Sequence, residues 1–262
     1  MRPNAVRTAS DRRGRADGAL RGLFRAARGL LTTALVLAAA PTLAGDRALL
    51  DLVGFSQDFR YFAFEEFGIQ DGSGFAYANL YIVDLSTDSW VVGTPIRVRA
   101  DDEERSLGAV RAEALSQAQS HIDDFRIEVP ADLLALNGDG APASDGKKLA
   151  FGFPTYLPGA LSGDYALSLA TFDTKAASPC AEWFGSAPKG YALTIADNGT
   201  KRLVHRDAGL PRSRGCPSDY RIHGVVAPFG SASLSNAVAI ISVYPGGFEG
   251  PDRRFLAVPL GL

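Results

Sequence analysis

The chain has 262 residues, of which 46% are hydrophobic and 21% are charged, and it contains 28 Gly and 15 Pro. This composition excludes a disordered or fibrous protein and allows a substantial buried core. The formal net charge of −2 is unevenly distributed, because residues 1–44 carry eight Arg and two Asp whereas residues 45–262 carry a net −8. An acidic body offers no broad basic surface, so we expect no nucleic-acid partner.

Residues 1–44 have the pattern of a signal peptide. Gly29 to Ala44 is an uncharged run rich in Leu and Ala, it follows three arginines, and Thr42-Leu43-Ala44 supplies small residues for cleavage between Ala44 and Gly45. A retained membrane anchor is the alternative, but a span needs about 20 apolar residues and this run is shorter. We therefore predict a soluble, periplasmic or secreted protein with no membrane span after cleavage, whose mature domain is residues 45–262.

Cys180 and Cys216 are the only cysteines, and both lie in the exported part. In an oxidising compartment such a pair is expected to form a disulfide. A metal-binding or redox-active pair is the alternative, but the C-x-x-C spacing is absent.

From Leu49 onward the chain has the pattern of short strands separated by turns. The aromatic segments Arg60–Glu65 and Asn79–Asp84 predict an antiparallel hairpin across the glycine-rich loop Gly68–Gly74. Asp197-Asn-Gly199 predicts a second, tight hairpin. The remaining strands are expected at Trp90–Val92, Ile96–Val98, Lys147–Phe151, Tyr165–Thr171, Tyr191–Ile195, Lys201–His205, Tyr220–Val226, Ala237–Tyr244 and Arg254–Val258.

One segment has helical rather than strand periodicity. Apolar residues recur at three- and four-residue steps through Leu107, Val110, Ala114, Ala118, Ile122 and Phe125. The acidic residues Asp101 to Glu104 before this segment and His121 near its end suit the helix dipole. A helical insertion is therefore predicted at about residues 102–125, inside a single domain.

Two stretches resemble the repeats of TolB-type β-propellers. The first runs through Phe55–Asp58, Arg60–Phe64 and Leu80–Leu85, and departs from the repeat at Gln57 and Phe59; the second is Ser144–Phe151. Phe64 and Phe151 stand 87 residues apart, about twice a blade length, so four irregular blades would fit in the mature chain. The expected fold is mainly β and antiparallel, a propeller-like or sandwich-like single domain with one inserted α-helix.

A second resemblance covers nearly the whole mature chain. The order of Gly54-Phe-Ser, Arg60–Glu66, Gly68–Gly74, the cysteine pair and Gly247–Phe255 resembles the bacterial family described as predicted secreted protein, domain of unknown function 2259. The resemblance implies export and no established activity.

Two acidic-aromatic regions are candidate binding sites. Glu65 and Glu66 are adjacent in a strand, so they should point to opposite faces and not share a proton; each could act singly or be a solvated or Arg-paired strand end. Asp71 lies in the neighbouring loop. The second region runs from Tyr244 to Phe255, and its charged residues, Glu249, Asp252, Arg253 and Arg254, would either bind a carboxylate or phosphate or pair with one another.

No local motif for a known reaction, cofactor or metal is found in the sequence. Asn137–Gly140 with Asp145 suggests a cation loop but lacks the EF-hand pattern, and His121, His205 and His223 lack zinc-ligand spacing. His205, Asp207 and Ser213 are close in sequence, but triad members must meet in space. The nucleophile elbow, the P-loop and the dinucleotide fingerprint are all missing.

The function predicted from these observations is non-catalytic binding of a protein, glycan or small molecule, through the loops Gly68–Gly74 and Gly246–Asp252. A secreted hydrolase that pairs Glu65 or Glu66 with Asp252 is one alternative, and a cation-stabilised structural protein is another. No cofactor is expected.

Overall fold

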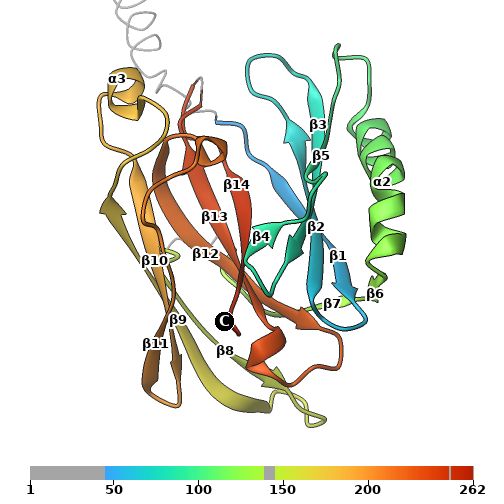
Figure 1. The fold of residues 1–262 in the computed structure, drawn as a ribbon, viewed down its shortest axis with the longest axis vertical. Coiled ribbons are helices and arrows are strands. Elements are labelled where there is room, and N and C mark those ends of the chain that lie inside the picture. Colours follow the sequence, from blue (N-terminus) through green and yellow to red (C-terminus); the bar gives the residue numbers. More distant parts are fainter. Residues whose placement is uncertain (1–44, 139–144, 248, 262) are drawn as a thin grey trace, which may run out of the picture. The chain divides into compact units, whose positions relative to one another are not determined.

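The computed structural model describes residues 45–138, 145–247 and 249–261. The predicted signal peptide, including Ala44 on one side of the predicted cleavage point, lies outside the described residues. Within them, three antiparallel sheets, two α-helices and two short 3-10 helices are formed (Figure 1).

Sheet 1 is built from strands that lie between Leu49 and Val129. Its strand order is β4-β3-β2-β1-β6, with β5 pairing along another part of β3. The strands are β1 (Leu49–Ser56), β2 (Tyr61–Ile69), β3 (Ala76–Asp84), β4 (Ser89–Trp90), β5 (Ile96–Arg99) and β6 (Ile127–Val129). The predicted hairpin across Gly68–Gly74 is confirmed, because β2 and β3 pair along their whole length from Tyr61 with Asp84 to Ile69 with Ala76.

Sheets 2 and 3 are built from the residues that follow β6. Sheet 3 is a four-stranded meander of β8 (Lys148–Pro154), β9 (Leu161–Asp173), β10 (Lys189–Asp197) and β11 (Thr200–Arg206). Sheet 2 has the order β14-β13-β12-β7, formed by β7 (Ala131–Leu136), β12 (Pro217–Pro228), β13 (Val238–Pro245) and β14 (Arg254–Pro259). The tight hairpin predicted at Asp197–Gly199 joins β10 to β11, with positive φ at Asn198 and Gly199.

The predicted helical insertion is confirmed as α2 (Leu107–Asp124), which begins after the N-cap Ser106. Its buried residues are Val110, Ala114 and Ala118, and they pack on sheet 1. The small alanines allow the helix to approach the sheet closely. A second helix, α3 (Cys180–Phe184), is too short to give a periodic signal in the sequence.

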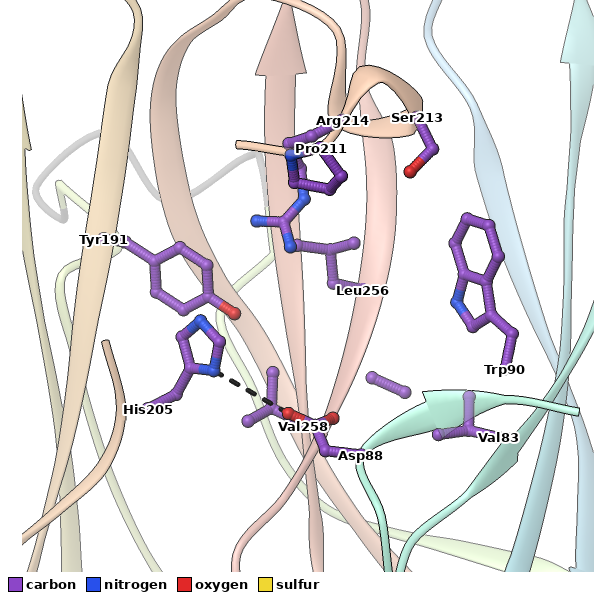
Figure 2. Close-up of a pocket in the computed structure, with 11 residues that line it drawn as sticks. Val83, Asp88, Trp90, Tyr191, His205, Pro211, Ser213, Arg214, Leu256 and Val258 are labelled. Atoms are coloured by element: carbon purple, nitrogen blue, oxygen red, sulfur yellow. Dashed lines mark ion pairs between the residues drawn. The ribbon is translucent and has the colours of Figure 1, made fainter. Parts of the chain in front are cut away.

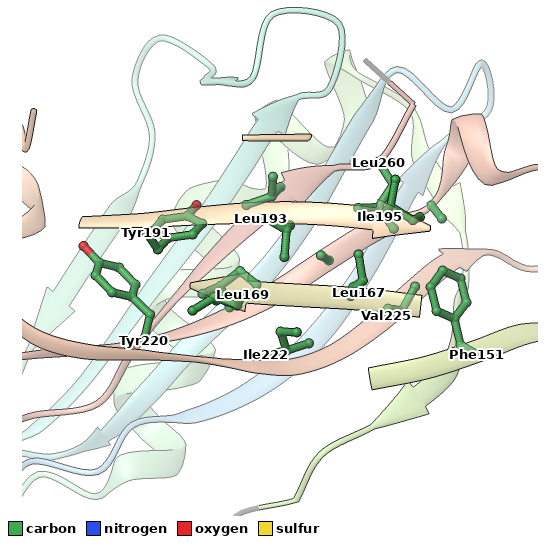
Figure 3. Packing of buried hydrophobic residues seen from close by; sticks show 14 of the residues in the cluster. Phe151, Leu167, Leu169, Tyr191, Leu193, Ile195, Tyr220, Ile222, Val225 and Leu260 are labelled. Atoms are coloured by element: carbon green, nitrogen blue, oxygen red, sulfur yellow. The ribbon is translucent and has the colours of Figure 1, made fainter. Parts of the chain in front are cut away.

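Sheet 2 lies between the other two sheets and is buried on both faces. Ile240 packs with Phe62 and Phe64 of sheet 1, whereas its neighbour Ile241 packs with Leu193 of sheet 3. Successive strand residues point to opposite faces, so a strand covered on both sides needs apolar residues throughout. Figure 3 shows the core between sheets 2 and 3.

The fold is mainly β and antiparallel, as predicted. The two propeller-like stretches lie in different sheets, one in β2 and β3 and the other beginning in β8. The described residues form three sheets rather than the four that the repeat spacing allowed, because β7 and β12–β14 combine into one. The sheets pack face to face, as in a sandwich, and their edge strands β4, β11 and β14 line a common cavity, as propeller blades do.

The predicted disulfide is present. Cys180, at the start of α3, is bonded to Cys216, which immediately precedes β12, with 5.4 Å between their Cα atoms. The described residues contain no free cysteine. The bond closes a loop that includes sheet-3 strands β10 and β11, so it ties sheet 3 to the start of β12.

Candidate ligand-binding groove

Two adjoining cavities, of about 260 and 240 Å³, run along the line where the three sheets meet. They share Trp90, Ser213, Arg214 and Leu256, so we treat them as one inter-sheet groove. Its walls come from β3, β4 and β5 of sheet 1, β10 and β11 of sheet 3, and β13 and β14 of sheet 2. Ligand sites in proteins typically occupy about 300–1,000 Å³, a range that the two cavities reach together.

A short loop covers part of the groove. It contains the 3-10 helix η1 (Arg212–Arg214) and ends at Gly215, next to the disulfide-bonded Cys216. Gly215 has φ of 67° and ψ of −143°, a conformation that only glycine adopts without strain. The turn at Gly215 and the disulfide together fix the position from which the Arg214 side chain enters the groove.

A cluster of four charged residues, the central cluster, lies at one end of the groove: Asp88, His205, Asp207 and Arg214. The His205 Nε2 lies 3.1 Å from Asp207 Oδ1, and its Nδ1 lies 3.7 Å from Asp88 Oδ2. Asp88 belongs to the turn between β3 and β4, so the imidazole joins sheet 3 to sheet 1. Figure 2 shows the His205–Asp88 pair below Arg214.

The two carboxylates keep His205 protonated. The hydrogen bond with Asp207 and then the longer contact with Asp88 raise the pKa of His205 to about 9, despite its partial burial. Burial favours a higher pKa for Asp207, but hydrogen bonds from His205 and from the Tyr191 backbone N–H outweigh it, so the pKa of Asp207 is lowered. At neutral pH His205 is therefore a cation with a carboxylate facing each ring nitrogen, and it has no lone pair with which to accept a proton.

Arg214 is the buried cation of the groove, with 14% of its side chain exposed. Its guanidinium lies 5.8 Å from the Tyr191 ring centre and 6.0 Å from that of Tyr220. Its polar contacts are long, 3.5 Å to the Tyr220 hydroxyl and 3.6 Å to Asp207 Oδ1. Charge-assisted hydrogen bonds are normally about 2.7–2.9 Å, so these contacts leave donor capacity for another acceptor.

Trp90 and Arg97 line the groove from the opposite sheet. Trp90 is 38% exposed and meets the buried Tyr81 edge to face, with 5.4 Å between ring centres. Arg97 pairs with β3 through its backbone, but its side chain has no hydrogen bond or ion pair with any other described residue. Figure 2 shows Trp90 and His205 on opposite sides of the first cavity, with Arg214 reaching between them.

Ser213 lines both cavities but does not form a triad with His205 and Asp207. No hydrogen bond joins Ser213 to the imidazole in the part of the chain that the structure describes, and Figure 2 shows its side chain on the Trp90 side of the cavity. Both imidazole nitrogens are already occupied by carboxylates. The three residues that are close in sequence thus share a cavity without the geometry of nucleophilic catalysis.

The two predicted carboxylates, Glu65 and Glu66, point to opposite faces of β2, as expected. Glu65 faces α2, where Arg111 donates two hydrogen bonds to Oε2 at 3.0 and 2.7 Å. Its Oε1 is buried without a partner in the structure. Glu65 therefore belongs to the packing of the helix on sheet 1 and is remote from the groove lining.

Glu66 belongs to a second charged group, the terminal cluster, formed by Asp46, Glu66, Asp252 and Arg254. Arg254 lies 2.6 Å from Asp46, 3.4 Å from Asp252 and 3.8 Å from Glu66. Glu66 is fully buried and accepts hydrogen bonds from the Phe255 backbone N–H at 2.8 Å and from Asn79 at 3.2 Å.

Burial is also the main influence on the acids of the terminal cluster. It raises the pKa of both Glu66 and Asp252, although Arg254 acts in the opposite direction on each. Asp46 accepts a hydrogen bond from the Tyr77 hydroxyl at 3.0 Å, and its own backbone N–H donates to Asp252 at 3.0 Å. The predicted Asp–Arg pairing within the Tyr244–Phe255 loop is thus present, extended by the distant residues Asp46 and Glu66.

The other predicted binding residues lie around the segment Gly45–Arg47. Asp71 lines an open cavity of about 630 Å³ with Gly45, and Tyr244 and Arg253 line another of about 270 Å³ on the other side. Glu249 is exposed. The loops Gly68–Gly74 and Gly246–Asp252 therefore flank the segment Gly45–Arg47 rather than the inter-sheet groove.

The described residues contain no group of three or more His, Cys, Asp or Glu side chains placed to hold a metal ion. Of the predicted cation loop, residues 139–144 lie outside the description, and Asp145 Oδ1 accepts a hydrogen bond from the Lys147 backbone N–H at 2.9 Å. The three histidines lie on α2, β11 and β12.

Sequence reasoning selected Glu66 and Arg254 for this region but missed most residues of the groove, above all Trp90, Arg97 and Arg214. The segment Arg212–Cys216 is basic and carries no motif, yet its second arginine lines the groove. One signal was available: Arg214 stands two residues before a cysteine, and a disulfide fixes the residues next to it.

Comparison with known proteins places the chain by family alone. No curated protein and no solved structure matches it. Among the described residues, no helix has both the length and the apolar character that crossing a bilayer requires. A family model described as "Predicted secreted protein (DUF2259)" matches residues 63–260, which include sheets 2 and 3, the helix α2, the groove lining and sheet 1 apart from β1 and the start of β2. The chain belongs to this family of predicted secreted proteins.

Proposed function

We propose that the protein is an exported, soluble, non-catalytic binding protein that holds a small ligand in the inter-sheet groove, in the periplasm or outside the cell. The observation that carries the proposal is the composition of the groove. It combines the partly exposed indole of Trp90 with the guanidinium groups of Arg97 and Arg214, on walls contributed by three sheets. Convergent polar groups beside an aromatic surface are typical of small-molecule sites.

The chemistry of the groove favours binding over catalysis. His205 is a cation held between two carboxylates, so it is unsuited to act as a general base near neutral pH. Both Glu66 oxygens face partners of the fold, Asn79 and Arg254 at Oε1 and the Phe255 N–H at Oε2. These side chains are therefore committed to holding the sheets together.

A hydrolase that uses Glu66 and Asp252 is the second candidate, favoured by one observation. Both carboxylates contact Arg254, so the fold brings them to the same side chain. A glycosidase pair would need one raised acid and one free base across a shared cleft. Glu66 lines the groove whereas Asp252 does not, which weakens this candidate.

The test uses Trp90 as its own reporter. The chain has two tryptophans, and Trp183 is 63% exposed on α3, so Trp183→Phe leaves a single indole in the groove. The full chain is expressed, and the exported, oxidised Trp183→Phe protein is screened against sugars, sugar acids, amino acids, short peptides and nucleotides by melting and by fluorescence. A ligand at 100 times its dissociation constant stabilises by about 2.7 kcal/mol, which is readily measured.

We expect a compound that raises the melting temperature also to change Trp90 fluorescence, and to lose affinity in Trp90→Ala. Stabilising compounds that leave Trp90 fluorescence unchanged and bind Trp90→Ala equally well would place the site elsewhere. Turnover of a screened compound that is lost in both Glu66→Gln and Asp252→Asn would favour the hydrolase.

A further inference from the structure

The cations that line the inter-sheet groove differ in how completely their hydrogen-bonding groups are used. Arg254 is held by Asp46 at 2.6 Å and Asp252 at 3.4 Å. His205 has a carboxylate at each nitrogen. Arg97 and Arg214 are the exceptions among the described lining residues: the Arg97 side chain has no hydrogen bond or ion pair, and the polar side-chain contacts of Arg214 are 3.5 Å or longer.

Arg214 is also positioned in advance. It is mostly buried, lies near the Tyr191 and Tyr220 rings, and is attached to the turn that the disulfide fixes at Cys216. A guanidinium held in place loses little freedom when it binds an anion, and its planar set of N–H donors matches the two oxygens of a carboxylate. Arg97 lines the second cavity together with Arg214 and supplies a second charge.

The acidic lining limits the charge of the ligand. Asp88 lines the first cavity and Glu66 lines the second, so a carboxyl side chain borders each part of the groove. A ligand with a single negative charge meets less repulsion from these carboxyl groups than a dianion such as a phosphate monoester. Trp90, which borders both cavities, offers an apolar surface for the body of such a ligand.

We propose that the groove binds a small organic monocarboxylate, whose carboxylate contacts Arg97 and Arg214 and whose apolar or sugar-ring face packs on Trp90. The inference rests on the proposed binding function and gives it a ligand class. It uses residues from β4, β5 and the loop before β12, so the site exists only in the assembled fold.

The test compares carboxylates with their neutral amides. Lactate, benzoate and glucuronate are titrated into the Trp183→Phe protein beside lactamide, benzamide and glucuronamide, with Trp90 fluorescence as the readout. We expect at least one carboxylate to bind and its amide to bind about ten- to a hundredfold more weakly, the effect of removing a hydrogen-bonded charge. Arg97→Gln should produce a similar loss.

Arg99→Gln is the matched control, because Arg99 lies two residues along β5 and does not line the groove. It should bind the carboxylate as the parent protein does. Arg214→Lys keeps the charge but removes the planar donor set, so it should also lose affinity; if it fails to fold, Arg97→Gln alone decides the matter.

Four outcomes separate the two proposals. Amides that change Trp90 fluorescence as strongly as carboxylates, or an unaltered affinity in Arg97→Gln, would overturn the ligand class and leave the binding groove standing. If none of the six compounds binds while other ligands from the broader screen still change Trp90 fluorescence, the ligand class is likewise overturned and the binding groove stands. If no compound in either experiment affects Trp90, the groove itself is rejected as the site.

Discussion

The central and terminal clusters are built from the same kinds of side chain, yet they differ in what they leave unused. In the terminal cluster, Arg254 contacts three carboxylates and Glu66 accepts from a backbone N–H and an amide. In the central cluster, Arg214 makes only long polar contacts and faces a cavity. Charge density alone therefore does not identify a binding site; unused donors beside a cavity do.

The largest loss of stability is expected from a substitution in the terminal cluster. Glu66→Ala leaves the Phe255 N–H and Asn79 without their acceptor and removes one partner of Arg254, in a fully buried position. Breaking a buried pair in this way typically costs about 3–5 kcal/mol. Urea unfolding should show this loss, whereas Glu249→Ala, at an exposed position, should change stability by less than about 0.5 kcal/mol. Equal effects of the two variants would contradict a structural role for Glu66.

The next largest loss of stability is expected from removal of the disulfide, which fixes the loop Arg212–Gly215 that covers part of the groove. Cys180→Ser with Cys216→Ser removes a link between residues 36 apart in sequence, which should destabilise the protein by about 2–4 kcal/mol. Because Gly215 and Arg214 adjoin Cys216, carboxylate affinity should fall as well. Melting curves and Trp90 titrations at a temperature where the variant remains folded would measure both. A destabilised variant with unchanged carboxylate affinity would mean that the loop Arg212–Gly215 keeps its position without the disulfide.

The central cluster should make stability depend on pH. Because the folded pKa of His205 is raised to about 9, its contribution is complete below about pH 6.5 and is lost as the pH rises through 9. The expected loss is about 1–3 kcal/mol, measured by urea unfolding across that range. Asp88→Asn removes one carboxylate and should move the decline to lower pH, and His205→Gln should flatten it. The same decline in His205→Gln would assign it to another group.

The smallest change in stability should come from the substitution of Arg97, whose side chain is unpaired among the described residues. Arg97→Gln removes a side chain that has no partner among the described residues, so stability should change by less than about 0.5 kcal/mol. Arg214→Gln should cost more, because it removes a buried guanidinium from beside Asp207 and Tyr220. Thermal unfolding of the two variants in parallel would make the comparison. A large loss in Arg97→Gln would show that this arginine supports the fold and is not reserved for a ligand.

The sequence predicted best what depends on neighbouring residues. The helix α2 was found because its buried face repeats every three or four residues, and the β10–β11 hairpin because Asn-Gly turns favour positive φ. The short strands β6 and β7 were missed, since Pro130 separates them and neither is long enough to show alternation.

The residues of the candidate site also fall into those that the sequence could predict and those that it could not. Glu66 and Arg254 could be predicted as site residues because other charged residues adjoin them in sequence. Asp88 and His205 stand 117 residues apart and meet only because sheets 1 and 3 both reach the edge of sheet 2. No local sequence pattern predicts the contact between Asp88 and His205, because it depends on how distant strands pack in the fold.

The pairing of the segment around Asp46 with Arg253 and Arg254 bears on the order in which the domain completes its fold. Asp46 is buried, its backbone carbonyl accepts from the Arg253 N–H at 2.7 Å, and its carboxylate is held by Arg254. Arg254 follows Asp46 by 208 residues in the chain. The segment around Asp46 therefore stays without these native partners until about 200 further residues have been synthesised, and any protease that acts on the growing chain would meet it unpaired.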